Sequence, residues 1–319
     1  MKGTTEGLQK GAFGLGSLIS APVTATRLLN RFRSRQLGLS IQGNALRFQF
    51  VEKGRVLGWA QVPFNPGFLR DGFVSDPQGM SRVIRNAILA NDIPAAPVMA
   101  AFPGHQSVVR VLQAPRAKDV DPKEVVPREA RRLMAYAPEE QELFWRQVEP
   151  TETSMRFLTL AVPKAPLHAF AQTLVLAGLA PERIELAPLS LIKLAPAGQT
   201  IIANMERDVL DIAIVVDSIP VLLRSLWLGN EPVSLDTAPE RLAEELNNTI
   251  AFYNDAYPAA VLPREQAILL AGGFPVEELA EVVANETGHP VMPLVPSLLV
   301  PEDYPVAAMA VTAGLLVKG

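Results

Sequence analysis

The chain of 319 residues has no cysteine and only three histidines. Without cysteine it forms no disulfide and no thiolate metal centre. His105, His168 and His289 stand far apart and none belongs to an HExxH pattern, so each is expected to be an ordinary surface or turn residue. The sequence also lacks GxxxxGK[ST] and GxSxG, which excludes a P-loop nucleotidase and the nucleophile of an α/β-hydrolase. No metal site is predicted.

Charge, aromatic side chains and long apolar runs are scarce as well. The net charge is −4 and aromatic residues make up 6% of the chain, so no basic aromatic face for nucleic acid is expected. The apolar run near the end, residues 306–317, holds 12 residues, fewer than the roughly 18 that a membrane span needs. A hydrophobic content of 49% in a chain of this length predicts a globular protein with two substantial cores.

The first 36 residues differ from the rest in charge. They carry six Lys or Arg residues and one Glu, a net charge of +5, which leaves −9 for the remainder. We interpret residues 1–36 as a flexible basic N-terminal extension. A signal peptide is disfavoured because glycines interrupt the apolar stretch and no A-x-A site follows. The alternative is a membrane-surface anchor with Leu28, Leu29 and Phe32 facing lipid. Its contacts with anionic headgroups would come from Arg27, Arg31, Arg33 and Arg35.

One pattern occurs twice in the chain. Residues 37–60 and 201–227 each read as a strand, a polar turn, a second strand, a two-residue turn and a third strand. The equivalent residues Ser40 and Asn204 lie 164 positions apart, which is too long for a solenoid period. The repeat predicts two similar lobes that face each other across a cleft, where ligands usually bind. The polar turns, 42–44 and 206–208, would meet across it.

The segments around the repeats predict an α/β protein. Each repeat is followed by a helix, a strand and another helix, which indicates sheets with helices on their faces. Residues 95–180 add a strand-strand-helix-strand-strand-helix unit to the first half. The expected domains are 37–95 with 181–199 as the core of the first lobe, 96–180 as an inserted module, and 200–319 as the second lobe.

Two further motifs lie in the second half. Ala271-Gly272-Gly273 ends a buried strand before a helix, where glycines let the backbone approach a flat ligand and the helix N-terminus favours an anion. A purely structural strand-to-helix turn is the alternative. The long helix predicted over 238–253 carries Glu245 and Asn248 on polar positions.

Several motifs together carry a family resemblance. They are Phe102-Pro103-Gly104, Glu129–Met134 before Ala137-Pro138, Ile184–Leu189, Leu242–Tyr253, Ala271-Gly272-Gly273 and Ala307–Leu315. In this order and spacing, the chain over residues 36–319 resembles the PilM proteins of type IV pilus assembly, which are relatives of FtsA. The resemblance implies an actin-like ATPase fold, a duplicated ribonuclease-H-like architecture, with residues 96–180 in the place of the 1C subdomain.

The resemblance also implies partners and a location. PilM relatives bind ATP in the cleft and hold the short cytoplasmic tail of PilN, a membrane protein, in a groove on the first lobe. They work with other components of the pilus platform and form a ring beneath it. The protein is therefore expected in the cytoplasm, at the inner membrane through its partners, with a homo-oligomeric ring and peripheral membrane contact of the N-terminal segment as further expectations.

The residues that the resemblance places at a nucleotide depart from the family pattern. Ser40 stands where the first phosphate loop has an acidic residue, and Asn204-Met205-Glu206 stands for D-[IL]-G. Glu206 would face the phosphates, and two charges about 4 Å apart at an effective dielectric of about 20 repel by about 4 kcal/mol. The nucleotide-binding positions implied are Ser40, Gly43, Asn44, Asn204, Glu206, Glu245, Asn248, Gly272 and Gly273.

We therefore predict that ATP with Mg²⁺, the cofactor of the family, binds weakly or not at all, that hydrolysis is absent, and that no residue is catalytic. A slip of two residues in the comparison would let Asp208 or Asp211 supply a carboxylate instead. The expected function is a PilM-like scaffold of a pilus, competence or secretion machine. A small-molecule kinase of the same superfamily and an FtsA-like filament protein are the alternatives.

Overall fold

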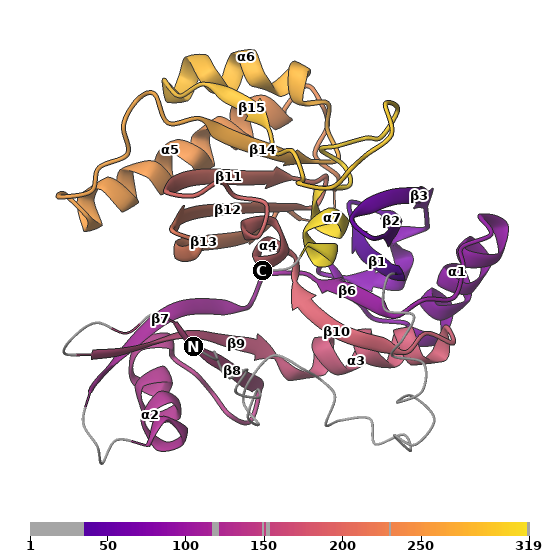
Figure 1. Ribbon diagram of the computed structural model, residues 1–319, viewed down its shortest axis with the longest axis horizontal. Helices are drawn as coiled ribbons and strands as arrows, with labels where there is room; N and C mark the ends of the chain where they lie inside the picture. Colours follow the sequence, from indigo (N-terminus) through magenta and orange to yellow (C-terminus); the bar gives the residue numbers. More distant parts are fainter. Residues whose placement is uncertain (1–34, 117–120, 149, 151–153, 230, 318–319) are drawn as a thin grey trace.

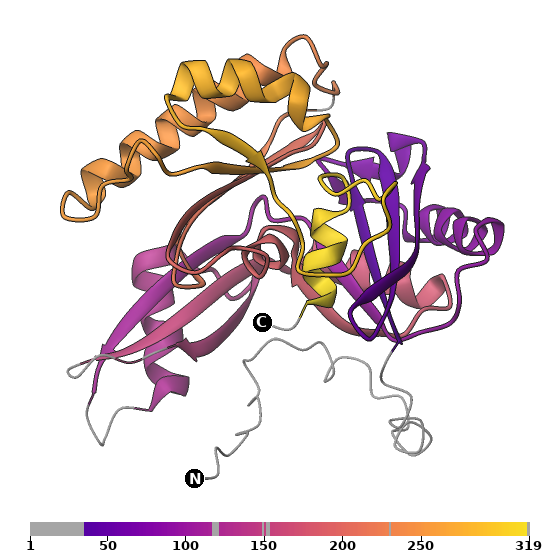
Figure 2. The ribbon, with the colours of Figure 1, turned by 45° about the horizontal axis from the view of Figure 1, so that its top comes forward.

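The computed structural model describes residues 35–116, 121–148, 150, 154–229 and 231–317. Two five-stranded sheets form two lobes (Figures 1 and 2). The first sheet has the order β10 (Pro181–Leu186), β6 (Val98–Phe102), β1 (Arg35–Gln42), β2 (Ala45–Glu52) and β3 (Arg55–Pro63). The second has the order β15 (Val291–Pro293), β14 (Ile268–Gly272), β11 (Gln199–Met205), β12 (Val209–Val216) and β13 (Ile219–Trp227).

The two sheets share one topology. In each, the first three strands form an antiparallel meander, and two later strands add in parallel beside the first. Ser40 pairs with Ala101 of β6, and Asn204 pairs with Ala271 of β14. The predicted equivalence of Ser40 and Asn204 is therefore met in three dimensions, and the chain contains a duplicated unit.

Turn chemistry explains why the meanders form. A two-residue hairpin turn that matches the strand twist needs positive φ at both central residues. Gly43 and Asn44 have φ of 58° and 62°, and Lys53 and Gly54 have 49° and 77°. In the second lobe Asp217 and Ser218 adopt 49° and 64°. Glycine, asparagine and aspartate tolerate this region best, so local sequence sets these turns.

Helices cover the sheets and join the lobes. In the first lobe α1 (Pro77–Ala90) begins at Asp76, whose carboxylate caps it by accepting from the Gly79 amide at 2.8 Å. This helix packs on α3 (Lys164–Leu176), while α5 (Ala238–Ala256) packs on α6 (Val276–Thr287) over the second sheet.

Two short helices lie between the lobes, α4 (Ala187–Ile192) and α7 (Ala310–Leu316) (Figure 1). The two helices approach closely because Gly314 has no side chain. A Cβ at this position would lie only 2.1 Å from the Ser190 carbonyl oxygen. The Ser190 hydroxyl in turn donates to the Val311 carbonyl at 3.1 Å.

A third sheet is separate from the sheets of the two lobes but packs against them. It has the order β7 (Val108–Pro115), β9 (Ser154–Pro163) and β8 (Gln141–Val148), and α2 (Pro122–Met134) packs against it with a small core of its own. The predicted module, 96–180, is wider than this sheet. It included β6, which pairs with β1 and β10, and α3, which packs on α1, because the strand pattern alone does not say which sheet a strand joins.

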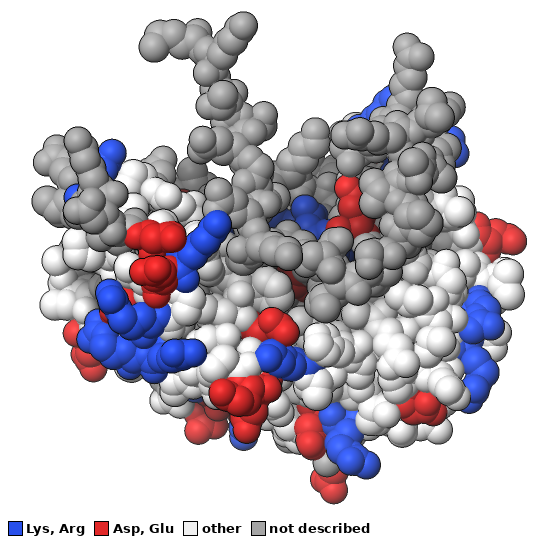
Figure 3. Space-filling model, turned by 90° about the horizontal axis from the view of Figure 1, so that it is seen from below, with Lys and Arg blue, Asp and Glu red and all other residues white. Residues whose placement is uncertain are grey.

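Surface charge is mixed on the face that Figure 3 shows. Positive and negative side chains lie there in small neighbouring groups. Arg132, an exposed arginine, pairs with Glu129 at 2.7 Å. Within the described ranges, no helix is both long and apolar enough to cross a membrane.

Candidate functional site

Strand β2 and the polar turn 206–208 meet between the lobes in a buried ion pair. Arg47 of β2 donates from Nη1 to Glu206 Oε1 at 2.8 Å and from Nη2 to Oε2 at 3.0 Å. The two side chains are 2% and 1% exposed. A second bond crosses the same gap, from the Gly43 amide to Asp208 Oδ1 at 3.1 Å. A parallel two-bond contact between guanidinium and carboxylate is a strong and directional form of ion pair.

The turn that carries Glu206 is fixed from several directions. The Glu206 amide donates to the Val209 carbonyl at 2.9 Å, which closes the turn. The Val233 amide donates to the Arg207 carbonyl at 2.7 Å, and the Leu228 amide to the Asp208 carbonyl at 2.8 Å. The Arg207 guanidinium lies over the Phe274 ring, 5.4 Å from its centroid. These contacts fix the backbone at Glu206 independently of its ion pair with Arg47.

Two further carboxylates lie close to the ion pair. Burial raises the pKa of Asp208 to about 6, and the negative Glu206 adds to the effect. Burial likewise raises the pKa of Asp211 to about 6. Asp211 accepts from the Asn204 side-chain amide at 3.1 Å and from the Ser225 hydroxyl. Among the described residues, no cluster of three His, Asp or Glu side chains has the arrangement of a metal site.

Five of the predicted nucleotide residues line this contact. A Cβ on Gly43 would lie 2.4 Å from Glu206 Oε2, and one on Gly273 would lie 2.7 Å from the same atom. Ser40 lies beside Arg47 in the sheet and Asn204 beside Asp211. The Ser40 hydroxyl and the Asn204 Oδ1 atom are buried and have no hydrogen-bond partner. The predicted residues therefore converge, but on an internal ion pair.

The other predicted residues have different surroundings. Glu245 on α5 pairs with Arg224 of β13 at 3.1 Å, and Asn248 is exposed on the same helix. The Gly272 amide donates to the Ala307 carbonyl at 3.0 Å, a backbone role. Of the predicted membrane contacts, Arg35 pairs with Glu52 at 3.1 Å. Arg27, Arg31 and Arg33 lie outside the described residues.

Space beside the turns is small. A cavity of about 40 Å³ opens there between the lobes, with Asn44 and Asp208 among its lining residues. Pockets for drug-sized ligands measure about 300–1,000 Å³. At about 40 Å³ this cavity has room for water and is too small for a nucleotide.

Aromatic rings close the gap next to it. His105 stacks on Phe73 of the first lobe at 4.1 Å between centroids and on Trp227 of the second lobe at 5.6 Å. Burial lowers the pKa of His105, which favours the neutral ring. His105 lies in a turn, as expected, but His105 and His289 are not on the surface: they are 2% and 4% exposed, because the packing of distant segments covers them.

Arg47 is the residue that sequence analysis missed. It alternates with apolar neighbours along β2, a pattern typical of a strand with one face toward water. Its role changes the argument about Glu206. That side chain does not present a bare charge to a phosphate, because Arg47 neutralises it. A phosphate would instead have to compete with Glu206 for Arg47, because these two side chains already bind each other.

Comparisons with known proteins point to the fold. No family model and no curated protein matches the chain. A solved chain of a PilM–PilN type IV pilus biogenesis complex is similar, with a TM-score of 0.72 and 19% identity over 88% of this chain and 97% of that one.

Two more distant structures also align with the chain. The cytoplasmic domain of EpsL, an inner-membrane component of the type II secretion system of Vibrio cholerae, gives 0.52 and 10% identity, over 90% and 97% of the two chains. The ethanolamine utilization protein EutJ from Carboxydothermus hydrogenoformans gives 0.51 and 10% identity, over 88% of each.

The chain has an actin-like ATPase fold. The duplicated sheets and the third sheet inserted after β6 agree with this fold as predicted. The two turns that the family resemblance implies beside a nucleotide are joined here by the Gly43–Asp208 bond, and Arg47 binds Glu206 next to it.

Proposed function

We propose that this chain is a PilM-like scaffold at the cytoplasmic side of an inner-membrane assembly platform, in a type IV pilus or a related competence or secretion machine. Its partner is the cytoplasmic tail of a PilN-like membrane protein. The observation that carries the proposal is the similarity of nearly the whole chain to a chain of a PilM–PilN complex. The similarity to the EpsL cytoplasmic domain supports a place beside a secretion platform.

The cleft supports a scaffold rather than an enzyme. The Gly43 amide, a backbone donor of the kind that binds phosphate, already donates to Asp208. Arg47, a cation that would suit a phosphate, is held by Glu206. A nucleotide would have to break both contacts, so we infer that Mg-ATP binds weakly or not at all.

Calorimetric titration of the full chain with the tail peptide of a PilN-like protein tests the partner. We expect saturable binding near about 1–10 µM, in the range of transient docking peptides, and no heat with a scrambled peptide of the same composition. Equal heats for the two peptides, or none for either, would reject the docking role.

Titration with Mg-ATP tests the cleft separately. We expect no heat for the wild type at high micromolar nucleotide. The variant Glu206→Gly restores the glycine of the family loop and frees Arg47, so it should bind the triphosphate at least about tenfold more tightly than the wild type. Tight Mg²⁺-dependent binding by the wild type, with turnover, would favour an active ATPase or kinase.

A further inference from the structure

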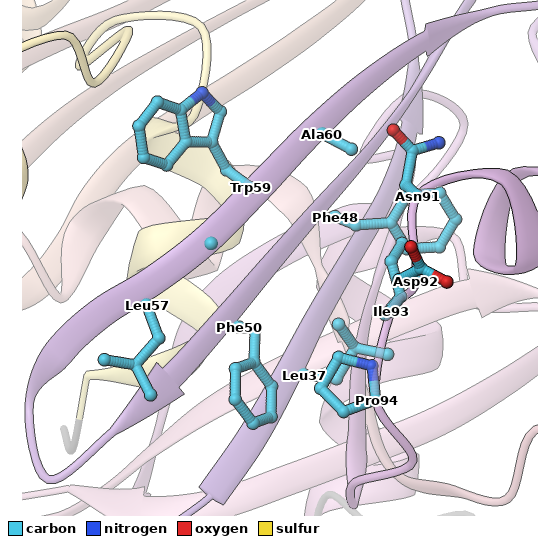
Figure 4. Close-up of a pocket in the computed structure, with 11 residues that line it drawn as sticks. Leu37, Phe48, Phe50, Leu57, Trp59, Ala60, Asn91, Asp92, Ile93 and Pro94 are labelled. Carbon is cyan, nitrogen blue, oxygen red and sulfur yellow. The ribbon is translucent and has the colours of Figure 1, made fainter.

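An apolar groove in the first lobe takes no part in the contact between the lobes. Its cavity of about 330 Å³ lies beyond the end of α1 (Figure 4). Leu37, Phe50 and Leu57 of the first three strands line it on one side, and residues 91–94 line it on the other. An engineered apolar cavity of about 150 Å³ holds one benzene, so this groove has room for two or three apolar side chains.

The groove is open at Gly58. A Cβ on this residue would have no atom within 4 Å, and its φ is not in the left-handed region. Leu57 beside it is 51% exposed. The groove therefore leaves apolar surface without cover among the described residues, a state that a bound apolar segment would relieve.

The residues that precede β1 in the sequence include an apolar segment of this kind. Strand β1 begins at Arg35, two residues before Leu37, so residues 1–34 join the described structure beside the lining. Phe32 is five residues before Leu37, and five extended residues span at most about 18 Å, more than twice the width of a cavity of this volume. A segment on so short a tether has an effective concentration in the millimolar range.

We propose that the N-terminal segment binds this groove in cis, with the apolar side chains of Leu28, Leu29 and Phe32 as its occupants. Charge supports this choice. Asp92 is the charged residue among the groove's lining, and the segment is strongly basic, with Arg31 between the apolar residues. A partner peptide or a lipid surface that takes up the same side chains competes with the groove, which makes the contact reversible. The proposal rests on the groove and the segment, and it stands if tail docking fails.

Limited trypsin digestion of the full chain tests occupancy. Gly58→Leu fills the groove, and the matched control Gln61→Leu adds the same side chain at an exposed position of the same strand outside the lining. Cleavage after Arg27, Arg31 and Arg33 should be about tenfold faster in Gly58→Leu than in the control, since the rate tracks the fraction of free segment. Equal rates in the two variants would overturn the proposal.

Disulfide trapping supplies an independent readout, because the chain has no cysteine of its own. The pair Phe32→Cys with Gly58→Cys should oxidise within one chain about tenfold faster than Phe32→Cys with Gln61→Cys, since a disulfide requires Cβ atoms about 4 Å apart. Similar rates for the two pairs would overturn the proposal. Crosslinked dimers would overturn the proposal and assign the groove to a second copy. If both Gly58→Leu and Gln61→Leu pellet with anionic vesicles to the same extent, and their trypsin rates are equal, the segment binds lipid and not the groove.

Discussion

The turn between β1 and β2 and the turn between β11 and β12 occupy equivalent places in the two lobes, yet they contribute opposite chemistry. The first lobe offers donors, the Gly43 amide and the Arg47 guanidinium. The second offers acceptors, the carboxylates of Asp208 and Glu206. The two faces are therefore complementary, and in this structure they bind each other.

A second comparison shows that burial decides what such pairs contribute. Arg47–Glu206 is almost fully buried, whereas Arg224–Glu245 is 33% and 15% exposed. Removing one partner of a buried pair leaves a charge without solvent, while an exposed charge is rehydrated.

Arg47→Met should cause the largest loss. It leaves Glu206 buried without a partner, which typically lowers the free energy of unfolding by about 3–5 kcal/mol. The double variant Arg47→Met with Glu206→Leu removes both charges and should recover most of that loss. Urea unfolding of the three proteins measures both effects. A double variant as unstable as the single one would show that packing, not charge, explains the defect.

Asp208→Asn should alter the dependence of stability on pH. The pKa of Asp208 is about 6 in the folded protein, above its ordinary value of 3.8, so its contribution is fully present below pH 4 and is lost as the pH rises through 6. Asparagine keeps the acceptor for the Gly43 amide and carries no charge. The variant should match the wild type near pH 4 and exceed it by up to about 3 kcal/mol above pH 7. Thermal unfolding of both proteins from pH 4 to 8 measures this difference. A variant that is less stable than the wild type above pH 7 would contradict the prediction.

Gly43→Ala should be worse than Gly54→Ala, although both glycines have positive φ. The Gly43 Cβ would meet Glu206 Oε2 at 2.4 Å, whereas the Gly54 Cβ has no atom within 4 Å. Backbone strain alone costs about 1 kcal/mol, and displacement of Glu206 should bring the loss for Gly43→Ala to about 2–3 kcal/mol. Chemical unfolding of the two variants compares them, and equal losses would mean that the turns do not press on each other.

Glu245→Gln should have the smallest effect. The pair with Arg224 is partly exposed, and such pairs contribute about 0.2–1 kcal/mol. The loss of stability should be smaller in 1 M salt, where the Debye length is about 3 Å and exposed charges are screened from each other. Melting curves at low and high salt test this, and a salt-independent loss above 2 kcal/mol would place Glu245 among the buried pairs.

Much of the fold follows from local sequence. The repeat predicts both meanders because strand alternation and turn residues act over a few positions, and Asp76 before Pro77 marks the start of α1. The expected module, 96–180, contains β6, which reads like any buried strand. Its partners, β1 and β10, lie far from it in the chain, so only pairing assigns it to the first sheet.

The candidate site divides along the same line. Sequence placed Ser40, Gly43, Asn204, Glu206 and Gly273 near one another, since they sit on equivalent strands and turns of a repeat. It did not find Arg47, and it gave no reason for the burial of His105. The amino-acid sequence alone indicates the duplicated unit and its turns, because both depend on residues a few positions apart. Only the tertiary structure decided that the two turns close on each other, because an ion pair between residues 159 positions apart depends on how the lobes pack.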